Sequence, residues 1–189
     1  VKEGLADRFG AERIVTAPGC CILDRDQEFL PFKGTKLSGA KEREDLGNRS
    51  DEELLEEAAS LAAEADTVIL TLGEHPQQSG EGGARTDLTL PACQLRLLET
   101  VYQSCKNVVV LLFSGRPLAV KEAAERASAI LAVWFPGTEG GNAAADILSG
   151  DVNPSGRLAM SFPYCTGQEP LCYSHLPTGR PSVKGSENR

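Results

Sequence analysis

Residues 67–91 read TVILTLGEHPQQSGEGGARTDLTLP, a stretch in which a short apolar run is followed by a long polar loop. It begins with an apolar run at 68–72, which predicts a buried β-strand. A long segment rich in Gly, Gln, Ser and charged residues follows before Leu90. Loops of that length are uncommon in a compact α/β domain unless they are functional. Because this loop leaves the carboxyl end of a strand, where open α/β sheets place their sites, we expect it to carry a functional residue.

Regular patterns on both sides of the loop predict alternating strands and helices. The runs 107–113 and 129–135 are apolar and β-branched, which is typical of strands covered on both faces. Ser50 and Glu53 form a capping box at the start of a helix with apolar residues at helical spacing. Pro91 suits the first position of the next helix. Further helices are expected at 2–9, 120–127 and 138–149, further strands at 13–16 and 157–162, and mostly irregular structure at 17–48.

This order of elements predicts an α/β fold with a mainly parallel sheet of about five to six strands and helices on both faces, a flavodoxin-like three-layer sandwich. Residues 1–163 are expected to form the sandwich domain. Residues 164–189 are rich in Pro, Gly and Ser and are expected to be an extended tail or linker toward a domain outside this chain.

Charge and composition exclude several classes of function. The net charge of −8 disfavours binding to nucleic acid or anionic lipid, and no apolar run approaches the length of about 20 residues that spans a membrane. The chain has neither a phosphate-binding glycine motif nor a GxSxG nucleophile elbow, so no nucleotide or other cofactor is expected. His75 and His175 lack ligand spacing, so no metal site is expected.

The six cysteines show no CxxC spacing. Cys93 and Cys105 fall in a helical pattern, where a buried thiol acts as a small hydrophobe. Free thiols are therefore expected, with one or more disulfides as the alternative. Unpaired cysteines favour the cytoplasm, and a periplasmic or secreted location stays open.

Carboxylate chemistry remains, and glycoside hydrolysis is one reaction that needs it. It uses a general acid near the leaving oxygen and a second carboxylate across the bond. Glu81 lies between Gly80 and Gly82, which leave the backbone free to project its carboxylate, although an exposed loop glutamate without a role has the same pattern. Glu74, next to the strand end, is a rival. Asp87, near the following helix, is expected to bond backbone groups instead.

Five segments resemble the second domain of glycoside hydrolase family 3, which includes β-glucosidases and β-xylosidases. They are GEHP (73–76), EGGARTDLTLP (81–91), SGRPL (114–118), WFPGTEGGNAAADILSGDVNPSGRLAMSFP (134–163) and YSHLPTGRP (173–181). The resemblance covers nearly the whole chain. Arg116, in the third segment, is expected to form an ion pair, either with another domain or locally.

The resemblance implies a partner and a reaction. In this family a TIM-like barrel supplies the nucleophilic aspartate and most contacts to the sugar, and the α/β domain lends a loop with the acid/base glutamate. Glu81, Arg85 and the segment 88–91 match that loop, and Ala84 stands where the family often has aspartate. The resemblance thus implies a retaining β-glycosidase acting on terminal β-linked sugars, with Glu81 as acid/base and Glu74 as the rival. The isolated domain is expected to be inactive; a non-catalytic sugar-binding or scaffold module is the alternative.

Overall fold

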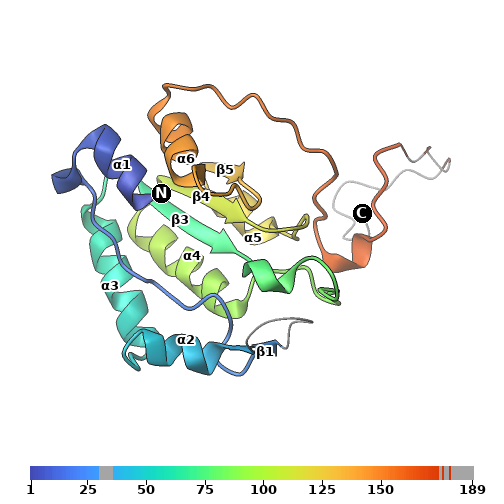
Figure 1. Ribbon diagram of the computed structural model, residues 1–189, viewed down its shortest axis with the longest axis horizontal. Helices are drawn as coiled ribbons and strands as arrows, with labels where there is room; N and C mark the ends of the chain where they lie inside the picture. Colours follow the sequence, from blue (N-terminus) through green and yellow to red (C-terminus); the bar gives the residue numbers. More distant parts are fainter. Residues whose placement is uncertain (30–35, 175, 177–178, 180–189) are drawn as a thin grey trace.

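A three-stranded parallel sheet lies at the centre of the computed structural model, which describes residues 1–29, 36–174, 176 and 179 (Figure 1). Its strands are β3 (Val68–Gly73), β4 (Val108–Phe113) and β5 (Ala129–Ala132), in that spatial order. Parallel pairing sets Gly73 opposite Phe113, so the carboxyl ends of β3 and β4 lie side by side. The apolar runs in the sequence thus predicted the central strands correctly.

Helices cover both faces of this sheet (Figure 1). On one face, α3 (Asp51–Glu64), α4 (Ala92–Ser104) and α5 (Lys121–Arg126) pack on alternate strand residues to form the main core. On the other, α1 (Lys2–Phe9) and α6 (Gly140–Ser149) pack against each other. The α/β class with a parallel sheet and helices is therefore confirmed.

Local signals set several helix ends as expected. The Ser50 hydroxyl accepts a hydrogen bond from the Glu53 amide at 3.1 Å, and the Glu53 carboxylate accepts one from the Ser50 amide at 2.7 Å. These two bonds are the predicted capping box. Gly150 ends α6 in the left-handed conformation, with φ of 84°. Pro91 lies one position outside α4, as its N-cap, rather than at its first helical position.

The sheet has fewer strands than the five to six expected. Residues 13–16 form no strand. They and β3 line a hollow of about 910 Å³, and no backbone hydrogen bonds of a β-ladder join the two segments. Residues 157–162 form none either: the chain swings away from the sheet after α6, and residues 157–160 are exposed (Figure 1). A short apolar segment becomes a strand only where a neighbouring strand offers backbone partners.

The remaining elements are short. Within 17–48, the chain forms a two-residue antiparallel pair, β1 (Glu28–Phe29) with β2 (Leu37–Ser38), and the helix α2 (Gly39–Asp45). Single 3₁₀ turns occur at η1 (Ala11–Arg13), η2 (Pro76–Gln78) and η3 (Thr166–Gln168).

The predicted tail at 164–189 lies partly outside the described residues. Its described beginning returns to the domain, because the Thr166 hydroxyl accepts a hydrogen bond from the Leu88 amide at 3.1 Å. All six cysteines are free thiols, as expected. Among the described helices, none has both the length and the apolar character needed to cross a bilayer.

Candidate active-site loop

The loop that follows β3 is fixed at its first residue. A Cβ at Gly73 would lie 1.7 Å from the Phe113 carbonyl oxygen, and its φ is 143°, so only glycine fits at this position. This close approach lets the Glu74 amide donate to the Phe113 carbonyl at 2.8 Å. The side chain of Gln94, from α4, holds Gly73 on the other side by bonding both its amide and its carbonyl oxygen. The loop therefore starts from a rigid point on the sheet.

Glu81 lies at the exposed tip of this loop. It is part of a turn that is closed by a 3.0 Å hydrogen bond from the Gly83 amide to the Gly80 carbonyl. Gly80 and Gly82 have positive φ, so the turn needs the glycines that flank Glu81 in the sequence. Within the described part of the chain, no hydrogen bond or ion pair reaches the Glu81 carboxylate. This carboxylate is thus available to a group outside the domain.

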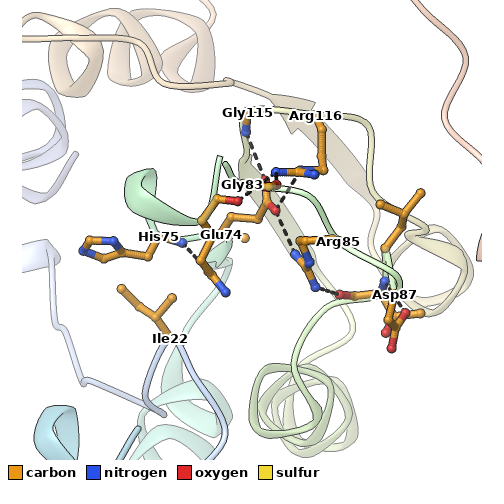
Figure 2. A network of polar contacts seen from close by, with 12 residues as sticks. Ile22, Glu74, His75, Gly83, Arg85, Asp87, Gly115 and Arg116 are labelled. Carbon is orange, nitrogen blue, oxygen red and sulfur yellow. Dashed lines mark hydrogen bonds and ion pairs between the residues drawn. The ribbon is translucent and has the colours of Figure 1, made fainter. Parts of the chain in front are cut away.

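Glu74 lies inside the domain, with its side chain only 1% exposed. Figure 2 shows its carboxylate between Arg85 and Arg116. Its Oε1 accepts a hydrogen bond from Nη1 of Arg85 at 2.8 Å and lies 3.1 Å from Nε of Arg116. The second contact is an ion pair, because the Arg116 Nε–H is not aligned for a hydrogen bond. The Gly115 amide donates to Oε2 at 3.2 Å. Both oxygens of Glu74 are therefore engaged within the domain, unlike the carboxylate of Glu81.

The two arginines connect Glu74 to the rest of the loop (Figure 2). Arg85 also donates to the Thr89 carbonyl at 3.0 Å, near the end of the loop. Arg116 donates through Nη2 to the carbonyls of Gln78 and Gly83. Arg116 thus forms its ion pair locally, one of the two expectations. Its long-range carbonyl contacts have no local sequence signal.

Asp87 bonds the backbone, as the sequence predicted. Its carboxylate accepts a hydrogen bond from the Thr89 amide at 2.9 Å, and the Thr166 hydroxyl also points to it. The Thr89 amide is the main reason that the pKa of Asp87 lies below its usual value. In its carboxylate form, Asp87 therefore helps to hold the end of the loop.

Asp24 is a further carboxylate whose role was not recognised in the sequence. It accepts hydrogen bonds from the amides of Ala92 and Cys93, at 2.9 and 2.6 Å, and so satisfies the first turn of α4. It also lines a hollow of about 550 Å³ beside the loop, together with Arg85 and Asp87.

Among the described residues, no group of three or more His, Cys, Asp or Glu side chains could hold a metal ion. Glu81 lines neither the hollow beside the loop nor the larger one beside β3.

Sequence relatives of this chain are glycosidases. It is 45% identical over 182 residues to the periplasmic beta-glucosidase of Salmonella typhimurium, covering 96% of this chain and 23% of that protein. It is 43% identical over 129 residues to a beta-xylosidase of Formosa agariphila, covering 68% of this chain and 18% of that protein. The chain thus spans about a fifth of the length of these relatives.

Solved structures agree with the sequence relatives. A beta-glucosidase from Listeria innocua, solved with gluconolactone, superposes with a TM-score of 0.67 at 45% identity, over 75% of this chain and 20% of that one. Residues 2–187 match the family described as the glycosyl hydrolase family 3 C-terminal domain. The chain therefore belongs to glycoside hydrolase family 3 and corresponds to the C-terminal α/β domain of that family.

Proposed function

We propose that this chain supplies the general acid/base, Glu81, to a retaining β-glycosidase whose nucleophile and sugar pocket lie in a TIM-like barrel of the same polypeptide. The observation that carries the proposal is the position of Glu81: an exposed carboxylate that has no partner among the described residues, at the tip of a loop that is anchored to the sheet. Family membership supports it, because the relatives are named as a beta-glucosidase and a beta-xylosidase. The substrate class is a terminal β-linked glucoside or xyloside.

In the proposed mechanism Glu81 acts twice. In the first step its carboxylic acid protonates the leaving oxygen while the nucleophile of the barrel attacks the anomeric carbon and forms a glycosyl–enzyme intermediate. In the second step the Glu81 carboxylate takes a proton from water, which attacks the same carbon and releases the sugar.

The test is Glu81→Gln in the full-length glycosidase. With a β-glucoside that has a poor leaving group, kcat/KM should fall by about 10²–10⁴-fold, because protonation of that group is lost. A dinitrophenyl glucoside, which needs no proton, should form the intermediate at a nearly normal rate, and added azide should intercept it as a glycosyl azide. The matched control is Glu56→Gln, an exposed glutamate on α3, which should behave like the wild type. Near-normal activity of Glu81→Gln on poor leaving groups would overturn the assignment and favour Glu74.

The isolated chain is proposed to be inactive, because it lacks the nucleophile and most of the sugar pocket. Purified to homogeneity, it should hydrolyse aryl β-glucosides no faster than the same chain carrying Glu81→Gln. Robust turnover that Glu81→Gln abolishes would show that the chain contains a complete site and would refute the shared-site proposal.

We propose that the whole enzyme works outside the cytoplasm, because the Salmonella relative, 45% identical over 182 residues, is named a periplasmic enzyme. The free thiols favoured a reducing interior, so the two arguments point in opposite directions. Fractionation of the native host decides between them: activity should be recovered with a periplasmic marker, and recovery with a cytoplasmic marker would refute the proposal.

A further inference from the structure

We infer that Arg116 is a positioning residue for Glu81, because its guanidinium ties together the two backbone segments on either side of the turn that carries Glu81. This inference rests on the proposed role of Glu81 as acid/base. Arg116 makes no contact with that carboxylate, so its effect on the reaction is indirect.

We call the Arg116 guanidinium and the two carbonyl groups that it bonds, those of Gln78 and Gly83, the clamp (Figure 2). Arg116 comes from the loop after β4, and its Nη2 donates to the Gln78 carbonyl at 2.8 Å and to the Gly83 carbonyl. Gln78 precedes the Gly80–Gly83 turn and Gly83 closes it. One planar group from a different loop therefore sets the distance between the two ends of the turn.

Glu74 connects the clamp to the sheet. That carboxylate, 1% exposed, lies 3.1 Å from Nε of Arg116 and accepts the amide of Gly115, the residue before Arg116. Glu74 directly follows β3 and Arg116 lies shortly after β4, and these strands end side by side. The position of Arg116 is thus fixed by two rigid strand ends before it reaches the turn.

The turn needs this support because its own backbone is permissive. Gly80 and Gly82 both have positive φ, and a Cβ on Gly80 would meet no atom within 4 Å. A misplacement of about 1 Å of a catalytic group can cost about 10²-fold in rate. An arginine suits the task because its planar fork presents five donors, whereas a lysine ammonium is a compact point charge with three.

Arg85 differs from Arg116 in the backbone carbonyl that it bonds. It also pairs with Glu74, but its second contact is to the Thr89 carbonyl, at the far end of the loop. Arg85 therefore anchors the base of the loop, and Arg116 is the arginine that holds the two ends of the Glu81 turn.

The experiment uses the full-length glycosidase with Arg116→Lys and Arg116→Gln. The matched control is Arg126→Gln, which removes an arginine that pairs with Glu99 between α5 and α4, away from the loop. Each variant is assayed on β-glucosides with poor and with dinitrophenyl leaving groups, and its melting temperature is recorded. Arg116→Lys keeps the positive charge beside Glu74 and provides a folded variant if Arg116→Gln is unstable.

The expected result depends on the leaving group. For poor leaving groups kcat/KM should fall by about 10–100-fold, whereas kcat/KM for dinitrophenyl substrates, which reports only the first step and needs no proton, should fall by less than about 3-fold. Arg126→Gln should match the wild type on both. Equal losses on both substrate classes, or losses that follow the fraction of folded enzyme, would assign Arg116 a structural role only and overturn the inference. Wild-type kinetics in both Arg116 variants would overturn it as well.

The double variant Arg116→Lys/Glu81→Gln separates this inference from the proposed function. If Arg116 acts through Glu81, adding Arg116→Lys to Glu81→Gln should cause little further loss on poor leaving groups. Full additivity would overturn the inference and leave the role of Glu81 intact. If Glu81→Gln alone shows no leaving-group dependence, the proposed function fails first, and the inference fails with it.

Discussion

Replacement of Glu74 by glutamine in this chain should cause a large loss of stability. The change keeps the shape of the side chain but removes its charge at a position that is 1% exposed. Glutamine has one acceptor oxygen, whereas the carboxylate uses two, toward the arginines and toward the Gly115 amide. In either orientation of the amide, its NH₂ group faces another donor, so at least one buried donor loses its partner.

The magnitude follows from the number and the burial of these contacts. A hydrogen bond to a charged group contributes about 1.5–3 kcal/mol, and breaking one side of a buried ion pair costs about 3–5 kcal/mol. Arg85 and Arg116 are 17% and 21% exposed, so water can solvate part of each freed guanidinium. We therefore expect Glu74→Gln to lower the free energy of unfolding by about 2–4 kcal/mol, a substantial part of the total for a typical domain.

Urea denaturation measures this loss. Trp134, the single tryptophan, packs on Phe162 with ring centroids 5.8 Å apart and provides a fluorescence signal for unfolding. The transition midpoint should fall by about 1–2 M while its slope stays unchanged, which reports a change in stability rather than in compactness. Glu99→Gln, which breaks the surface pair with Arg126, is the control and should shift the midpoint far less. Equal shifts in the two variants would refute the reasoning, because the buried pair would then contribute no more than a surface pair.

Three further predictions concern the core, the loop end and the thiols. Leu98→Ala, at a side chain with 0% exposure, should lower the free energy of unfolding by about 2–5 kcal/mol in the same urea assay, and a loss below about 1 kcal/mol would contradict the packing. Asp87→Asn should destabilise the chain at neutral pH, because the pKa of Asp87 is lowered on folding; this difference from the wild type should vanish as the pH falls through that lowered pKa, and a difference that persists in acid would refute the electrostatic explanation. The neighbouring Cys20 thiol and burial raise the pKa of Cys93, so in native protein at pH 7 iodoacetamide should label the exposed Cys172 well before Cys93; mass spectrometry of the labelled peptides gives the order, and earlier labelling of Cys93 would contradict the prediction.

The sequence predicted the parts of the fold that depend on short-range signals. Continuous apolar runs identified the three strands of the sheet, and the Ser50–Glu53 pair located the start of α3. Residues 13–16 and 157–162 have similar strand propensity, yet neither is a strand in the described structure. A strand needs the backbone groups of a neighbour, and propensity does not say whether a neighbour is in place. The fold class was therefore more predictable than the number of strands.

The candidate site shows the same division. Flanking glycines singled out Glu81, and the end of β3 singled out Glu74, but local pattern could not decide which carboxylate faces outward. That choice depends on Arg116, which is 42 residues from Glu74 along the chain but in contact with it. Contacts of this range come from strand pairing, which brings the ends of β3 and β4 together. The structure supplies this information, and a single sequence does not.

The contact between Arg116 and Glu74 also limits what a loss of activity can prove. If Glu81 is the acid/base, as proposed, Glu74→Gln in the full-length enzyme should also slow protonation of poor leaving groups, because Glu74 holds Arg116, which bonds both ends of the Glu81 turn. Slow turnover in both Glu74→Gln and Glu81→Gln would therefore not identify the acid. Azide provides the distinction: it should intercept the glycosyl–enzyme intermediate efficiently only when the carboxylate beside the anomeric carbon is gone, since that carboxylate repels anions and activates water. Glycosyl azide formed by Glu81→Gln but not by Glu74→Gln would assign the acid/base to Glu81, and the reverse pattern would assign it to Glu74.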